Sequence, residues 1–249
     1  MSRLVFDTMG TTVSLETPGG AAPDKLRDVF TEADSRFSLY RNDSEASALA
    51  HGLALTDTSE EFREVYAMAN DWRLATDGAF TPHRPDGIID LSGIVKAWAM
   101  ARAETVLQGA GLDAWCLNVG GDVAIRGVQP GGAAWTLGVT DPFDRGRILA
   151  AASIDFPRTA AATSGSAERG DHIWRLGDPA LPRFAQVTVV APDIVMADVL
   201  ATAIVAAGPG ELDAFTETWP IDVLAVLESG AMLATPGMRA AIARFTAAD

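Results

Sequence analysis

The pattern of apolar and polar positions predicts a chain that changes repeatedly between strand and helix. Strand-like alternation occupies residues 4–15 on both sides of Met9 and Gly10, where the glycine suggests a bulge or close packing. Apolar residues recur at helical spacing in residues 23–36. A polar turn then leads into a short helix for which Asp43 or Ser44 is the candidate cap.

A longer helix and a second, more hydrophobic one follow in the middle of the chain. Thr58 and Glu61 have the spacing of a capping box at the start of the first, and the pair Asp77-Gly78 provides its stop. A Pro-rich loop leads from there to Asp90. Ser92 is the candidate cap of the second helix, which runs into an apolar strand and a Gly-rich hairpin.

The second half of the chain predicts short strands separated by Gly, Pro and Asp turns. The strand-like segments are WTLGV, RILAAASIDF, TAAATSG, QVTVVA and IDVLAVLE. The apolar segment IVMADVLATAIVAAG predicts a helix between the last two, and a terminal helix is expected at about residues 236–245. Without repeats, linkers or low-complexity segments, the sequence predicts a single α+β domain over residues 1–249, with mixed or antiparallel sheets and packed helices.

Composition restricts the partners of this domain. The 249 residues are 48% hydrophobic and 21% charged, with a formal net charge of −14, which argues against nonspecific nucleic-acid binding. An anionic ligand would therefore need a local cation or a metal ion. The lone Cys116 excludes an internal disulfide and is expected to be a buried small hydrophobic residue. No signal-like N-terminus or long uncharged apolar run is present, so we expect a cytoplasmic protein without membrane insertion.

Residues 90–127 combine features that suit an anionic ligand. Ser92 and Gly93 would open a helix, whose first N–H groups and partial positive charge attract phosphate, and Lys96 adds a cation. Gly120 and Gly121 allow the backbone to approach a ligand, or they allow a turn with positive φ. Both interpretations of the glycines remain open, and an ordinary turn is the more common one.

The apolar helix in the second half carries two oxygen-bearing side chains on one face. Asp198 and Thr202 are four residues apart, and a buried carboxylate must be paired, neutralised or bound to a cation. Mg²⁺ prefers such oxygen ligands. The alternative is that Asp198 caps the helix near its start while Thr202 bonds back to a carbonyl.

Other candidate chemistry is weaker. The spacing of His51, His83 and His172 matches no zinc pattern, although His172 follows a turn and is a possible loop base. Ser164 lacks the G-x-S-x-G context of a hydrolase nucleophile, and both common phosphate-loop signatures are absent.

Taken together and in order, several stretches resemble the ApbE family of FAD:protein FMN transferases. They are MGTTVSLE, SLYRNDSEASAL, DGAF, IDLSGIVKAWA, LNVGGDVAIRG, ATSG, HI, VTVVAP and ADVLATA. The resemblance implies an ApbE-like, T-fold-related domain. It also implies an Mg²⁺-dependent enzyme that transfers the FMN moiety of FAD to a Ser or Thr hydroxyl of an acceptor flavoprotein and releases AMP.

The same resemblance implies roles for individual residues. His172 matches a catalytic histidine, which we interpret as the candidate base for the acceptor hydroxyl. Gly93, through its carbonyl, and the side chains of Asp198 and Thr202 match metal ligands. The positions that match FAD-contacting residues are Met9, Ala79, Phe80, Thr81, Asp90, Lys96 and Ile173.

The chain departs from the family's pattern at several places around the flavin. Thr81 stands where the family usually has Asp, Ala97 where it has Gly, Arg102 where an acidic residue is common, and Ala50 where Asn is common. Trp174 replaces an acidic residue after the histidine. Two alternatives therefore accompany the transferase: an FAD pyrophosphatase that produces FMN and AMP, and a non-catalytic flavin-binding protein.

Overall fold

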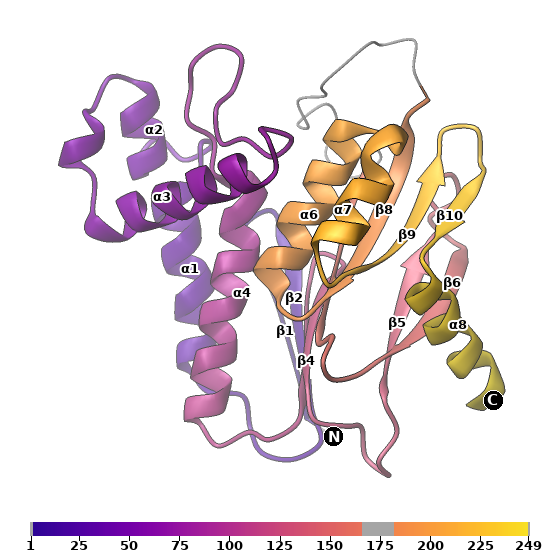
Figure 1. Ribbon diagram of the computed structural model, residues 1–249. Coiled ribbons are helices and arrows are strands. Elements are labelled where there is room, and N and C mark those ends of the chain that lie inside the picture. The colour runs from indigo at the N-terminus through magenta and orange to yellow at the C-terminus, as the bar shows by residue number, and fades with distance from the viewer. Residues whose placement is uncertain (1, 166–181, 249) are drawn as a thin grey trace.

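The central feature of the computed structural model, which describes residues 2–165 and 182–248, is an eight-stranded antiparallel sheet (Figure 1). Its strands lie in the order β1-β2-β3-β4-β7-β8-β9-β10. Their bounds are β1 Ser2–Thr8, β2 Thr11–Thr17, β3 Trp115–Val119, β4 Asp122–Arg126, β7 Ala160–Gly165, β8 Phe184–Ala191, β9 Asp222–Leu227 and β10 Met232–Ala234. A separate antiparallel pair is formed by β5 (Trp135–Thr140) and β6 (Ile148–Ile154).

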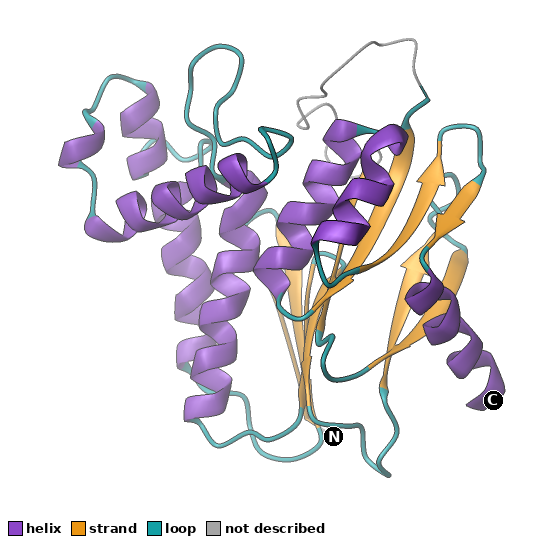
Figure 2. Cartoon of the chain, viewed as in Figure 1, coloured by secondary structure: helices purple, strands orange, loops and turns teal. Residues whose placement is uncertain are grey.

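Helices cover one face of this sheet, and the β5–β6 pair with the last helix lies on the other side (Figure 2). The helices are α1 Lys25–Phe37, α2 Glu45–Ala50, α3 Glu60–Ala75, α4 Ser92–Gly109, α6 Ile194–Ala207, α7 Leu212–Thr218 and α8 Pro236–Ala248. Two short 3₁₀ turns, Leu55–Asp57 and Pro209–Glu211, complete the described elements. The predicted α+β class with an antiparallel sheet is confirmed.

Two hydrophobic cores follow from the two-residue period of the strands. On β8, Val189 packs into the core shared with α1, α4 and α6, whereas Val190 packs into the core beneath β5, β6 and α8. On β7, Ala162 and Ala161 divide in the same way. Because both faces of the sheet are covered, all of β8 is buried, which explains why its sequence reads as a continuous apolar run.

Helix α6 is buried on nearly every side because it packs against α4, α7, β7 and β8. This environment explains its largely apolar composition. Within residues 2–165 and 182–248 no single helix is long and apolar enough to cross a membrane, although α6 joined to Pro209–Thr218 passes on length and composition as a pair bent by 119°.

The predictions for the β1–β2 turn and for the cap of α3 were wrong in detail. Met9 and Gly10 form the tight turn of the β1–β2 hairpin, both with positive φ, instead of a bulge or close packing, since a Cβ on Gly10 would meet nothing within 4 Å. Helix α3 is capped by Ser59, which accepts the Phe62 N–H at 3.2 Å, and not by Thr58. The capping-box spacing pointed one residue too early.

The cap at the start of α4 also differs from the prediction. Ser92 is the first helical residue, and its N–H donates to Asp90 Oδ1 at 2.9 Å, so the aspartate makes the turn that enters the helix. At α2 one of the two candidates is confirmed, because Ser44 Oγ accepts the Ser47 N–H at 2.9 Å.

The start of helix α8 contacts the sheet at Asp222, the first residue of β9. Asp222 accepts a hydrogen bond from the Thr235 hydroxyl at 2.9 Å and pairs with Arg158 at 2.9 Å. Gly237, in the first turn of α8, lies so close to this carboxylate that a Cβ there would overlap it. The glycine therefore provides room for the acidic group beside the helix N-terminus, a position that favours negative charge.

Gly237→Ala is accordingly expected to lower the free energy of unfolding by about 1–3 kcal/mol, because the methyl group must displace a hydrogen-bonded carboxylate. Urea denaturation measures the change. Gly210→Ala is the matched control, since a Cβ at Gly210 would meet nothing within 4 Å. Equal stability of the two variants would contradict this account of α8.

Candidate active site

The Gly-rich turn between β3 and β4 is a hairpin turn that positions Asp122. Gly120 and Gly121 have φ values of 61° and 98°, as a two-residue turn of this kind requires. The Gly120 N–H donates to Thr12 O at 3.1 Å, and the Gly121 N–H donates to Asn118 Oδ1 at 3.1 Å. Because both N–H groups bind within the protein, the structure favours the turn interpretation of these glycines over a direct ligand cradle.

Asp122 follows this turn and forms a buried ion pair with Lys96. The side chain of Asp122 is 1% exposed and that of Lys96 is 11% exposed, and Nζ contacts Oδ2. The lysine extends from the first turns of α4, so the pair joins the helical layer to the sheet. A buried charge of either sign is stable only when it is compensated in this way.

The end of β7 connects Asp122 to α6. The Thr163 N–H donates to Asp122 Oδ1 at 3.1 Å. The hydroxyl of the next residue, Ser164, lies 3.0 Å from the Thr202 hydroxyl on α6. The Thr163 hydroxyl lies 2.9 Å from that of Thr188 on the opposite face of the sheet. On the helical face, the Asp122 carboxylate and the Ser164 and Thr202 hydroxyls lie where the end of β7 meets α6.

Asp198 occupies α6 one turn before Thr202 and is 5% exposed. It does not cap the helix: Asp193 is the cap, and its Oδ1 accepts the Met196 N–H at 2.8 Å. Thr202 bonds to Ser164 across the interface. The structure thus contradicts the helix-cap alternative for Asp198 and leaves a buried carboxylate in an apolar helix.

The loop between α3 and α4 brings several predicted flavin contacts to the start of α4. Phe80 is buried, and its ring lies 3.2 Å from the position that a Cβ on Gly93 would take. The Asp90 N–H donates to Pro82 O at 2.8 Å, which folds the loop back on itself. The remaining members of this group are the buried Ala79 and the half-buried Thr81, whose hydroxyl accepts the His83 N–H at 3.2 Å.

Met9 lies in the β1–β2 turn, next to the turn that contains Gly120. A Cβ on Gly120 would overlap the Thr11 hydroxyl, so the two turns are in contact. The β1–β2 and β3–β4 turns therefore lie at the same end of the sheet, and Met9 and Asp122 lie beside each other's hairpins at that end. His172 and Ile173 lie outside the described residues, and their predicted roles stay predictions.

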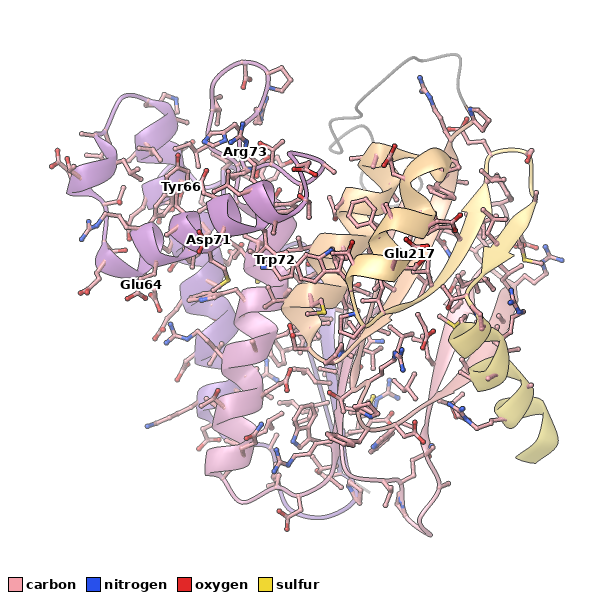
Figure 3. The ribbon with its side chains drawn as sticks, viewed as in Figure 1. Glu64, Tyr66, Asp71, Trp72, Arg73 and Glu217 are labelled. Atoms are coloured by element: carbon pink, nitrogen blue, oxygen red, sulfur yellow. The ribbon has the colours of Figure 1, made fainter. Side chains whose placement is uncertain are left out.

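The imidazole rings of the other two histidines have partners outside this group. His83 Nε2 lies 3.0 Å from the Tyr66 hydroxyl, and Tyr66 and Arg73 both come from α3 (Figure 3). Burial lowers the pKa of His83, and the positive charge of Arg73 lowers it further. His51 Nδ1 lies 2.7 Å from Ser47 O. Both histidines therefore contribute to local structure.

Two other residues noted in the sequence are also explained by local packing. Arg102 forms an ion pair with Glu61 and lies over the Trp98 ring, 4.9 Å from its centroid. This departure from the family's pattern thus joins α4 to α3. Burial raises the pKa of Cys116 to about 12, and the charge of Glu16 contributes, so this thiol is a poor nucleophile at neutral pH.

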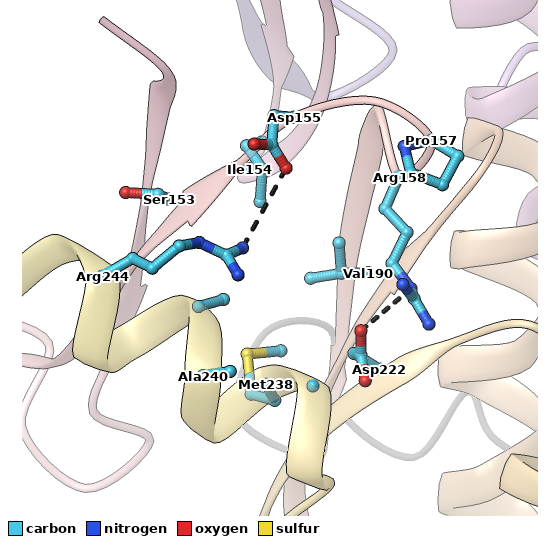
Figure 4. Close-up of a pocket in the computed structure, with 12 residues that line it drawn as sticks. Ser153, Ile154, Asp155, Pro157, Arg158, Val190, Asp222, Met238, Ala240 and Arg244 are labelled. Carbon is cyan, nitrogen blue, oxygen red and sulfur yellow. Dashed lines mark ion pairs between the residues drawn. The ribbon is translucent and has the colours of Figure 1, made fainter.

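A cavity of about 110 Å³ lies elsewhere in the molecule, between β6, β9 and α8 (Figure 4). Arg158 with Asp222 and Arg244 with Asp155 form ion pairs at its rim. None of the described residues predicted for the site lines it. Its volume is well below that of an ordinary ligand pocket.

Comparison with known proteins identifies the family. The ApbE family matches residues 9–84 and 83–226. These two ranges together cover most of the chain. The chain belongs to the ApbE family. The resemblance expected from the ordered motifs is therefore confirmed.

Curated ApbE relatives share part of their length with this chain. The FAD:protein FMN transferase of Rhodobacter capsulatus is 32% identical over 169 residues, which cover 61% of this chain and 30% of the relative. The FAD:protein FMN transferase of Vibrio cholerae is 27% identical over 183 residues, which cover 69% of this chain and 54% of the relative. The chain thus spans about half or less of the length of these two relatives.

Solved ApbE structures match the fold over nearly the whole chain. The flavin transferase ApbE from Vibrio cholerae has a TM-score of 0.77 at 24% identity and covers 96% of this chain and 98% of its own. The ApbE protein from Thermotoga maritima has a TM-score of 0.78 at 21% identity, with coverage of 97% and 99%. The predicted ApbE-like fold is confirmed.

Sequence reasoning assigned no role to three polar residues that join this site: Asp122, Thr163 and Ser164. A signal for Asp122 was present, because an acidic residue opening the apolar segment DVAI must find a buried partner. The partner, Lys96, is 26 positions away in sequence, and only the packing of α4 on the sheet brings the two together.

Proposed function

We propose that this ApbE-family protein transfers the FMN moiety of FAD to a Ser or Thr hydroxyl of an acceptor flavoprotein and releases AMP. The observation that carries the proposal is the joining of the Lys96 ammonium, through Asp122 and the end of β7, to the oxygen-bearing face of α6. Phosphoryl-type transfer depends mainly on charge neutralisation at the phosphates and on positioning of the nucleophile. This arrangement suits the first requirement, because it joins a cation to oxygen-bearing side chains.

The residues predicted to hold Mg²⁺ fit a hard cation by their chemistry. The Asp198 carboxylate is buried, and the Thr202 hydroxyl lies one turn further along the same face of α6. The Gly93 carbonyl belongs to α4, which packs against α6. All three supply oxygen, the ligand that Mg²⁺ prefers. Within residues 2–165 and 182–248 no three His, Cys, Asp or Glu side chains form a metal cluster.

Bound Mg²⁺ would neutralise charge on the pyrophosphate of FAD. The protein's own residues contribute the rest. Lys96 is the cation that we assign to the phosphates, and the partial positive charge at the start of α4 favours the same anion. Met9, Ala79, Phe80, Thr81 and Asp90 are the residues that we assign to the flavin and its phosphates, together with Ile173.

The acceptor protein supplies the nucleophile in this proposal. Its Ser or Thr hydroxyl loses a proton as the new bond to phosphorus forms, and AMP leaves. We assign His172 as the base that takes this proton. An exposed Ser- or Thr-containing motif on the acceptor is the recognition element that the reaction requires.

The direct test is incubation of the purified protein with FAD, with and without Mg²⁺, followed by chromatography of AMP and FMN. We expect Mg²⁺-dependent AMP release that increases when an acceptor is added, with flavin becoming covalent on the acceptor. AMP together with free FMN in the absence of acceptor would establish the pyrophosphatase instead. Binding of FAD with no AMP, even with an acceptor peptide, would establish a flavin-binding protein and overturn the proposal.

A further inference from the structure

Asp122 makes two different contacts with its two carboxylate oxygens. Oδ2 pairs with the Lys96 ammonium, and Oδ1 accepts the Thr163 N–H at 3.1 Å. The side chain is 1% exposed, so water does not compete for either oxygen. The carboxylate therefore connects α4, β4 and β7 at a single point.

The contact with β7 extends to α6. Ser164 follows Thr163 directly, and its hydroxyl lies 3.0 Å from the Thr202 hydroxyl. A displacement of Asp122 would therefore shift the Lys96 ammonium, which contacts Oδ2. It would also shift the end of β7, which contacts Oδ1 and bonds to Thr202 on α6. These are the two places where the proposed function needs positive charge and oxygen ligands.

The ion pair also sets the charge that an incoming anion meets. A lysine side chain has four rotatable carbon–carbon bonds, and the carboxylate restricts its ammonium to one position. At the same time the negative charge of Asp122 offsets most of the attraction that Lys96 exerts on a phosphate. Asp122 thus improves the position of the lysine and weakens its pull on the substrate.

We propose that Asp122 is a positioning residue, which holds the Lys96 ammonium in the orientation that the transition state requires and does so at the expense of ground-state FAD affinity. This inference rests on the proposed function. It predicts that loss of the Asp122 charge strengthens FAD binding and slows turnover. The orientation of the Lys96 ammonium matters in the transition state, whereas the net charge around it acts on any bound phosphate.

The experiment uses Asp122→Asn in the full chain. The amide oxygen can still accept the Thr163 N–H, while the negative charge beside Lys96 is lost. We expect FAD to bind about tenfold more tightly without Mg²⁺, measured by quenching of flavin fluorescence, since a repelling charge has been removed. We expect kcat for AMP release to fall by about 10- to 100-fold.

Asp141→Asn is the matched control. Asp141 is 2% exposed, accepts the Phe143 N–H at 2.8 Å and pairs with Arg147, but it lies in the turn between β5 and β6. It therefore has the same local chemistry away from the proposed site. We expect this variant to lose stability without change in FAD affinity or in kcat per folded molecule.

A purely structural role for Asp122 would weaken FAD binding and turnover together, and that result would overturn the inference, as would unchanged values. If Asp122→Asn fails to fold, Lys96→Gln is compared with the double variant Lys96→Gln/Asp122→Asn. Because Asp122 acts through Lys96, the two should have the same kcat within about threefold. A larger difference would overturn the inference.

Failure of the proposed function gives a different result. Wild-type protein that binds FAD but releases no AMP contradicts the transferase, and the binding comparison still decides the charge effect of Asp122. Wild-type protein that binds no FAD contradicts both. Wild-type protein that binds FAD and releases AMP, with Asp122→Asn indistinguishable from it, contradicts the positioning role alone.

Discussion

Replacing Asp198 with alanine is expected to abolish Mg²⁺-dependent AMP release, with a loss on the order of 1,000-fold, because it removes the charged member of the proposed metal-binding set. Alanine suits an apolar helix, so α6 should still form. The second readout is thermal: Mg²⁺ should raise the melting temperature of the wild-type protein, as any ligand of the native state does, and should not raise that of the variant.

Asp213→Ala provides the control, since Asp213 is an exposed acidic residue on α7, the neighbour of α6. It should retain both AMP release and the thermal response to Mg²⁺. Full activity of Asp198→Ala would remove this residue from the site, and an unchanged response to Mg²⁺ would show that the ion binds elsewhere.

Replacing Glu104 with glutamine is expected to stabilise the protein at pH 8 by about 3 kcal/mol and to have little effect at pH 4. Glu104 lies on α4, where the pKa of its carboxyl is raised from 4.5 to about 7, mainly by burial. The charge of Asp193 contributes to this increase, and that of Arg126 opposes it. The folded protein therefore binds this proton more tightly than the unfolded chain.

The sign of the pH dependence follows from this difference. The stabilising effect of the protonated carboxyl is complete below the unfolded pKa of 4.5 and is lost as the pH rises through the folded pKa of about 7. Urea denaturation at several pH values should show the wild-type protein losing stability across this interval and Glu104→Gln losing less. Glu32→Gln, at an exposed position of α1, is the control. Parallel curves for wild type and Glu104→Gln would contradict the assignment.

Hydrophobic periodicity predicted the long elements well because their burial dominates their composition. Helix α6 is apolar on all sides since it lies between α4 and the sheet, and β8 is continuously apolar since both of its faces are covered. The short α7 and the three-residue β10 had no such signal and were not predicted. Their formation depends on packing against elements that are already in place.

Local hydrogen-bond competition explains the errors at the helix starts. Thr58 and Ser59 are adjacent candidates for the α3 cap, and the Thr58 hydroxyl donates to Leu55 O at 2.7 Å, which leaves Ser59 to cap. Asp90 and Ser92 compete in the same way at α4. Sequence spacing does not rank such neighbours. The pairing of Lys96 with Asp122 was beyond prediction for a different reason, since it depends on how α4 lies on the sheet.

The order of strands in the large sheet has a consequence for how the chain folds. Except for the β5–β6 excursion, each strand pairs with the next one in sequence, from β1 at one edge to β10 at the other. During synthesis each new strand therefore meets an edge that is already formed, and no strand must be inserted between two earlier ones. Each newly paired strand therefore becomes the unpaired edge of the sheet until β10 is added. This order limits the time for which the edge of the apolar β8 is exposed and able to aggregate.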